Sequence, residues 1–190
     1  HYSAHLGNAY DADGDQTNSS LYWAKSAQAN SNFVLGATRD LIARIRKGET
    51  ALKVEETLKR LESFGAELLG KTDTAAIAIT RSALAWREGQ GEAAVKAADA
   101  AIVAGGPTAF HLYYKGMGHL AAAQTEEGFK ALKGAVDAEP SSKRYLAALV
   151  KAYTDGGKVD EAIKTLLAQP KKDQAEADFH VQLGDAYRTK

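Results

Sequence analysis

Apolar residues recur at helical spacing along most of the chain, for example at Ile77, Leu84 and Val95. Because residues three, four or seven positions apart share one face of a helix, this pattern predicts amphipathic α-helices. Alternation of strand length is hard to find. The chain has only three prolines, and each follows a helical stretch at a point where a helix is expected to stop. We therefore expect an all-α fold with short loops.

The chain also repeats itself every 34 residues. Segments that begin at Ala75, Ala109, Lys143 and Ala177 align with one another, and small or turn-forming residues match down the columns. The matched sets are Ser82, Gly116, Val150 and Gly184; Gly89, Ala123 and Gly157; Ala94, Gly128 and Ala162; and Val95, Phe129 and Ile163. Two helices cannot bury both of their apolar faces alone, so neighbouring units must stack. We expect the small residues of the first helix to face those of the second.

Each unit is expected to contain a first helix, a tight turn and a second helix. Glycine or alanine in the Gly89 column permits a tight reversal of the chain. Four residues that precede apolar-periodic runs are predicted to cap helices: Asp73, Thr108, Thr125 and Ser142.

The period and the columns resemble the tetratricopeptide repeat (TPR). The residues that match the family pattern are Gly116, Ala135, Pro140, Tyr153, Gly157 and Ala162, together with the similar phrases Leu183-Gly184-Asp185-Ala186-Tyr187 and Leu6-Gly7-Asn8-Ala9-Tyr10. The resemblance implies an all-α, right-handed superhelical α-solenoid. It also implies a single array over residues 1–190, with units at about 1–33, 34–74, 75–108, 109–142 and 143–176 and a partial unit at 177–190.

Some positions depart from the family pattern. The residues from Leu68 to Thr74 interrupt the register, and Lys53 stands where a small residue is expected. Arg81 and Lys115 occupy a column that is normally apolar. We expect these departures to affect the packing of the second unit rather than the class of fold.

Composition narrows the classes of function. The chain has 24 basic and 24 acidic residues, and this balance argues against a nucleic-acid partner or an anionic membrane surface. The absence of cysteine excludes disulfides, thiolate metal sites and a cysteine nucleophile. No apolar stretch is long enough to predict membrane insertion. We expect a soluble protein, and the sequence leaves its compartment open between the cytoplasm and, if a signal has been removed, the periplasm.

One acidic segment resembles the first half of a calcium loop. Asp11, Asp13 and Asp15 supply oxygen at alternate positions, but Gln16 replaces the expected glycine and Tyr22 replaces the bidentate glutamate. An acidic turn between two helices is the favoured interpretation, with an ion at the three aspartates as the weaker alternative. No motif for a nucleophile, a phosphate loop or a cofactor is present. We therefore predict no catalytic residues and no cofactor.

The resemblance also implies a binding surface, because in TPR proteins one stripe of the first helices lines a concave groove. Carried over column by column, this stripe is apolar and aromatic in its middle and charged towards one end. The predicted partner-binding residues are Ile79, Trp86, Phe110, Tyr113, Met117, Leu120, Arg144, Lys151 and Asp185. An aromatic patch with a charged border suits a peptide or helix with hydrophobic anchors. The alternative is that the aromatic side chains only pack between helices.

The sequence thus favours a non-enzymatic adaptor or scaffold that binds another protein. The chaperone-tail clamp of some relatives is not expected, because Ala76, Ile79 and Ala83 stand where its polar residues would be. Two alternatives remain. The chain is a scaffold that assembles with itself through its terminal units, or it is the TPR domain of a larger enzyme or of a secretion or assembly complex.

Overall fold

A computed structural model describes residues 6–7, 9–10, 13, 15–29, 32–64, 69–169, 174 and 177–189 of the 190-residue chain. The regular elements in this part are all α-helices. They are α2 (Gln16–Ala29), α3 (Phe33–Lys47), α4 (Ala51–Glu62), α6 (Lys71–Arg87), α7 (Gly91–Gly105), α8 (Ala109–Ala121), α9 (Thr125–Ala138), α10 (Lys143–Asp155), α11 (Val159–Leu167) and α13 (Ala177–Thr189).

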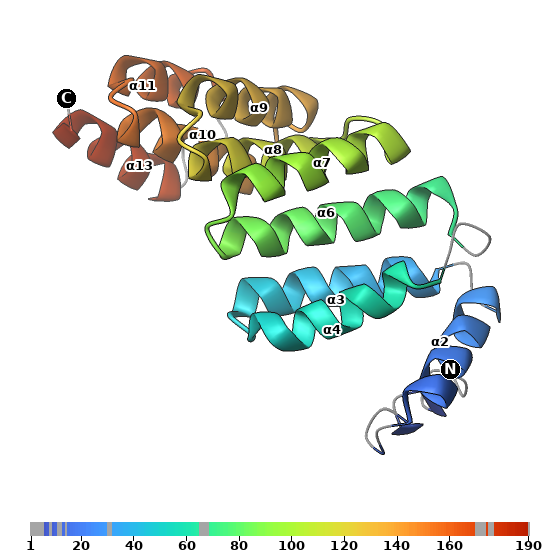
Figure 1. The fold of residues 1–190 in the computed structure, drawn as a ribbon. Helices are drawn as coiled ribbons and strands as arrows, with labels where there is room; N and C mark the ends of the chain where they lie inside the picture. Colours follow the sequence, from blue (N-terminus) through green and yellow to red (C-terminus); the bar gives the residue numbers. More distant parts are fainter. Residues whose placement is uncertain are drawn as a thin grey trace.

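The helices from α3 to α13 stack in the order of the sequence (Figure 1). α6 packs against α7, α8 against α9 and α10 against α11, and each pair also contacts the next. α3 contacts α6, and α6 contacts α8, so these first helices of successive pairs form a layer of their own. α2 lies at an angle to the row, near the end that holds the N-terminus. Such nearest-neighbour packing defines an α-solenoid and confirms the predicted fold class.

The reversals between paired helices use the left-handed backbone conformation. Gly48, Gly89 and Gly157 have φ angles of 89°, 74° and 75°, and Ala123 has a φ of 59°. Gly89, Ala123 and Gly157 are the turn column that the repeat pattern predicts. Glycine adopts this conformation without steric cost, whereas an alanine there is disfavoured by about 1–2 kcal/mol.

In the pairs α6–α7 and α8–α9, the predicted small residues lie at the contact between the two helices. The hydroxyl of Ser82 in α6 donates a hydrogen bond to the carbonyl oxygen of Ala94 in α7 over 2.8 Å. In the next pair, a Cβ atom placed on Gly128 of α9 would lie 3.4 Å from the carbonyl oxygen of Gly116 in α8. Larger side chains at these positions would force the paired helices apart.

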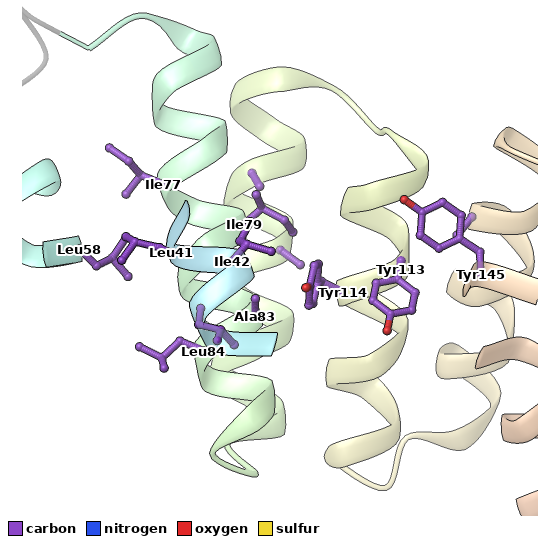
Figure 2. Packing of buried hydrophobic residues seen from close by; sticks show 14 of the residues in the cluster. Leu41, Ile42, Leu58, Ile77, Ile79, Ala83, Leu84, Tyr113, Tyr114 and Tyr145 are labelled. Atoms are coloured by element: carbon purple, nitrogen blue, oxygen red, sulfur yellow. The ribbon is translucent and has the colours of Figure 1, made fainter. Parts of the chain in front are cut away.

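One apolar core runs from α3 to α10. Figure 2 shows a part of it, in which Leu41 lies beside Leu58, Ile42 beside Ile79, and Tyr114 next to Tyr113. A smaller cluster joins α10, α11 and α13 through Val150, Ala162, Leu166 and Phe179. The continuous core holds the first helices in fixed positions relative to one another.

The predicted interruption of the repeat falls between α4 and α6. Residues 65–68 lie outside the described residues, and α6 already begins at Lys71, so that it is 17 residues long against 13 for α8. The expectation that Asp73 precedes this helix was wrong, because Gly70 is the N-cap and Asp73 lies within the first turn. There its carboxylate accepts a hydrogen bond from the backbone N–H of Gly70 over 3.3 Å. Part of the segment that interrupts the repeat thus forms an additional turn at the start of α6.

The other predicted caps have mixed outcomes. Thr108 is the N-cap of α8, and its hydroxyl oxygen accepts a hydrogen bond from the backbone N–H of His111 over 3.2 Å. Ser142 is the N-cap of α10 but makes no such side-chain bond. Thr125 is the first residue of α9, with Gln124 before it as the N-cap, so the prediction for Thr125 was wrong by one position.

The two charged residues in the apolar column form ion pairs with the preceding helix. Arg81 of α6 lies 2.7 Å from the Glu62 carboxylate and 3.2 Å from that of Glu55. Lys115 of α8 lies 2.7 Å from the Asp99 carboxylate of α7. These pairs replace the apolar contacts that the family pattern leads one to expect. They connect neighbouring units at the surface rather than through the core.

Candidate functional site

A pocket of about 540 Å³ opens between α3, α6 and the start of α8. Its walls are mostly apolar, with two arginines from α3. The lining residues are Leu35, Thr38, Arg39, Ile42, Arg46, Thr72, Ala75, Ala76, Ile79, Gly105, Thr108, Phe110 and His111. Thr72 belongs to the additional first turn of α6, so the interruption of the repeat contributes to the wall. We call this the first pocket.

A second pocket of about 390 Å³ adjoins the first, and Arg46 lines both. Its walls come from α3, α6, α8 and α10 and from the turn after α3. They are Ile45, Arg46, Gly48, Trp86, Arg87, Tyr113, Tyr114 and Arg144. The two pockets together form a continuous surface, which we call the groove.

Aromatic rings form the wall of the groove towards α8 and α10. Tyr114, only 1% exposed, is at the centre of this group. Its ring centroid lies 5.0 Å from that of Phe110, 5.0 Å from that of Tyr113 and 6.1 Å from that of Trp86, all in edge-to-face geometry. Tyr113 lies in turn 5.3 Å from Tyr145 of α10, and Figure 2 shows these two rings side by side. Such contacts restrain each ring.

The arginines of the groove lie over this aromatic wall. The guanidinium of Arg46 is 5.8 Å from the ring centroid of Phe110, and that of Arg144 is 5.7 Å from the centroid of Tyr113. Both distances are within the range of cation–π attraction. Burial raises the pKa of the Tyr113 hydroxyl above its ordinary value, although Arg144 and Arg46 act in the opposite direction. The hydroxyl therefore stays neutral at physiological pH.

Two further polar side chains of the groove, Arg87 and His111, are held by backbone atoms. Arg87 donates hydrogen bonds to the carbonyl oxygens of Ile45 and Glu49, over 2.9 Å and 2.7 Å. His111 is 8% exposed, and its Nδ1 lies 2.8 Å from the carbonyl oxygen of Gly106. Because a carbonyl oxygen only accepts, Nδ1 carries the proton in this contact. Both side chains join a loop to a helix.

The apolar members of the predicted site lie at different depths. Ile79 and Phe110 line the first pocket, and Trp86 and Tyr113 line the second. Trp86 and Phe110 are partly exposed, whereas Ile79 and Tyr113 retain only 3% and 7% exposure. The structure thus brings these four residues together, with two of them forming the floor.

Two further apolar residues of the prediction pack towards the core. Met117 and Leu120 are partly buried against the main apolar cluster. A Cβ atom on Gly128 of α9 would lie 2.7 Å from Cδ2 of Leu120, which shows that Leu120 fills the contact between α8 and α9.

Of the three charged residues in the predicted site, one lines the groove and two form ion pairs on the surface of their own helices. Arg144 lines the second pocket. Lys151 is exposed and lies 2.8 Å from the Asp155 carboxylate on its own helix. Asp185 is exposed on α13, 3.3 Å from the guanidinium of Arg188.

The contribution of α3 was missing from the predicted site. Leu35, Thr38 and Ile42 line the first pocket, and Ile45 lines the second. If the unit that begins at Val34 is read with the same column rule, these residues occupy the groove positions. The column rule therefore contains the signal for these residues of α3. Arg39 and Arg46, which stand one place beyond two of these columns, carry no such signal.

The acidic turn near the N-terminus is described in part. Asp11 lies outside the described residues, and Asp13 is exposed. The two carboxylate oxygens of Asp15 accept hydrogen bonds from the backbone N–H and the side-chain amide of Asn18, over 3.1 Å and 2.7 Å. Asp15 immediately precedes α2, so this geometry is that of an N-cap. The described residues contain no group of three or more potential metal ligands.

Comparison with known proteins agrees with the repeat pattern. Residues 119–183 match the family model of the tetratricopeptide repeat. A search among curated proteins found no match. Of the helices described, none is both long enough and apolar enough to cross a membrane.

Solved structures share the fold across nearly the whole chain. A thermophilic TPR protein of Thermus thermophilus is 15% identical, with a TM-score of 0.66 and 98% of each chain covered. A tetratricopeptide repeat protein from Parabacteroides merdae is 14% identical, with a TM-score of 0.61 over 99% of this chain and 72% of that one. MamA from Desulfovibrio magneticus is 15% identical, with a TM-score of 0.57 over 100% and 95%.

The stacked helix pairs define an α-solenoid, a class of fold that serves as a protein-interaction module. Residues 119–183 match the tetratricopeptide-repeat family model, and nearly the whole chain shares the fold of a solved TPR protein.

Proposed function

We propose that the chain is a non-enzymatic adaptor or scaffold that holds a peptide or helix of a partner protein in the groove. The observation that carries this proposal is the pair of adjoining pockets, which share Arg46 and are walled by aromatic side chains. Partner proteins commonly contribute a few large anchor side chains that fill such pockets.

The groove has the dimensions and the rigidity for this task. Pockets of about 540 and 390 Å³ fall within the size range of protein binding sites. Their walls belong to helices whose inner faces form one core, so little ordering of the chain is needed on binding. Trp86 and Phe110 are the proposed contact residues of the aromatic wall, because both line the groove and remain partly exposed.

The test uses a library of random 12-residue peptides displayed on phage and selected on the full chain. A pocket-filling variant, Ala76→Trp, places an indole in the first pocket. Its matched control is Ala93→Trp, which adds the same side chain at an exposed position of α7 outside the groove. We expect the selected peptides to lose binding to Ala76→Trp and to retain it on Ala93→Trp. If no selected peptide distinguishes these two variants, the proposal is wrong.

Self-assembly is a second candidate because α13 has exposed apolar side chains. Val181 and Tyr187 are 62% and 54% exposed, whereas Phe179 and Ala186 on the same helix are buried. Light scattering across a range of protein concentrations tests this alternative. A mass that rises with concentration in the wild type and stays monomeric in Val181→Ser would support it, and a constant monomeric mass in both would exclude it.

A further inference from the structure

We infer that the partner segment is acidic, with an apolar anchor side chain flanked by Asp or Glu residues. This inference rests on the proposed function and specifies the chemistry of the partner. It comes from the distribution of charge around the groove, which differs sharply from that of the whole chain.

The charge of the groove is of one sign. Among the described residues that line the two pockets, four are arginines and none is an aspartate or glutamate: Arg39, Arg46, Arg87 and Arg144. The whole chain has equal numbers of basic and acidic residues. The positive charge is therefore concentrated on this surface, where low-dielectric walls strengthen its field.

None of these four arginines has a carboxylate partner in the part of the chain that the structure describes, and only Arg87 is held by backbone carbonyl oxygens. Arg39, Arg46 and Arg144 are exposed and form no ion pair there. Elsewhere the chain does pair such residues: Arg44 lies 2.6 Å from the Glu49 carboxylate, and Arg81 binds two glutamates. A carboxylate from a partner protein would form the same kind of ion pair with the groove arginines.

The arginines are spaced along the surface in a way that suits several carboxylates. Arg39 and Arg46 are seven residues apart on α3, which corresponds to about 10.5 Å along a helix axis. Arg144 comes from α10, at the far wall of the second pocket. The apolar floor of the first pocket, with Ile42 and Ile79, and the ring of Phe110 line the same pocket as Arg46. A segment whose anchor enters the first pocket can therefore place carboxylates on both sides of that anchor.

Two arginines are also held in position for this contact. The cation–π geometry places the guanidinium of Arg46 over Phe110 and that of Arg144 over Tyr113. A guanidinium over a ring face keeps its edge N–H groups available for bidentate bonding to a carboxylate. A partner therefore meets donors that are already oriented.

The test begins with the peptides selected by phage display on the full chain. We expect Asp and Glu to be enriched on both sides of an aromatic or branched aliphatic residue. Synthetic peptides of the selected sequences should bind the double variant Arg46→Glu/Arg144→Glu at least about tenfold more weakly than the wild type. Both sites are exposed, so the fold should survive, and circular dichroism verifies this. The control Lys130→Glu/Lys164→Glu makes the same change of charge on α9 and α11 and should leave affinity within about twofold.

The outcomes separate this inference from the proposed function. Acidic peptides that Ala76→Trp blocks and the arginine reversals weaken would support both. Neutral or basic peptides that Ala76→Trp blocks, with no effect of the reversals, would overturn the acidic partner and leave the proposed function standing. The absence of any peptide that Ala76→Trp blocks would overturn both.

Two other possible ligands of the groove, a second copy of the chain and a nucleic acid, would give results that differ from those of an acidic peptide. Self-association that Ala76→Trp abolishes would assign the groove to a second copy of the chain and overturn the inference. Binding of a fluorescent single-stranded oligonucleotide that depends on Arg46 and Arg144, without selection of acidic peptides, would assign the arginines to phosphate and also overturn it.

Discussion

The contact between α7 and α8 leaves no room for a side chain at Gly91, and this makes the substitution Gly91→Ala a direct test of the stacking. Gly91 is the first residue of α7 and is buried. A Cβ atom there would lie 2.6 Å from the backbone carbon of Ala121 and closer still to the backbone nitrogen of Ala122, at the end of α8. Backbone atoms cannot rotate away as a side chain can, so the two helix ends must separate.

The size of the effect follows from two opposing contributions. Ordinary contacts between heavy atoms are about 3.5–4.0 Å, so the helix ends must move apart by roughly 1 Å. Overpacking of this kind costs about 1–3 kcal/mol. Replacing glycine by alanine restricts the unfolded chain and returns about 0.4–1 kcal/mol. We therefore expect Gly91→Ala to lower the free energy of unfolding by about 1–2 kcal/mol, and the melting temperature by about 2–8 °C.

Gly36→Ala is the matched control. Gly36 lies inside α3, and a Cβ atom there would meet no atom within 4 Å. The same substitution should then raise the free energy of unfolding by about 0.4–1 kcal/mol. Urea unfolding followed by helical circular dichroism measures both variants. If Gly91→Ala were as stable as the wild type, the close approach of α7 and α8 would be wrong.

Three further predictions concern single contacts. Ser82→Ala removes the buried hydrogen bond to Ala94 and should lower the free energy of unfolding by about 0.5–1.5 kcal/mol in urea titration. Thr108→Ala removes the cap on His111 and should cost about 1 kcal/mol in the same assay; no loss would contradict the cap. Burial raises the pKa of Tyr113, so its contribution to stability is complete below about pH 10 and falls as pH rises from there towards the raised value. Thermal melts from about pH 9 to 11 should therefore show a smaller loss in Tyr113→Phe than in the wild type, and equal losses would refute this.

The fold was predictable because its determinants are local and repeated. The 34-residue period identified the columns that lie at the turns and at the contacts between paired helices, and Gly89 and Ser82 are examples. The start of α6 was not predictable in this way, because a period says nothing about an interruption. Aspartate is a residue type that often caps helices, yet Asp73 lies in the first turn of a helix that begins earlier, at Lys71.

The groove was only partly predictable, for a related reason. A column rule indicates which residues face the same side of neighbouring helices, and it places Trp86, Phe110 and Arg144 on this surface. It does not indicate how deeply a residue is buried or which charges find partners. Leu120 and Lys151 satisfy the rule, but Leu120 packs against Gly128 and Lys151 pairs with Asp155. Burial and pairing depend on the neighbouring helix, which the rule does not consider.

The same residue type serves two purposes on two surfaces of the array. Arg81 replaces an apolar residue at the contact of α6 with α4, and two glutamates of α4 neutralise it. Arg39 and Arg46 of α3 face the groove, where the described residues supply no carboxylate, and the cation–π contact with Phe110 only orients Arg46. The charge of Arg81 thus contributes to ion pairs between neighbouring helices, whereas the charges of Arg39 and Arg46 remain available in the groove. Because the chain as a whole is neutral, the field that a partner meets depends on this asymmetry and not on net charge.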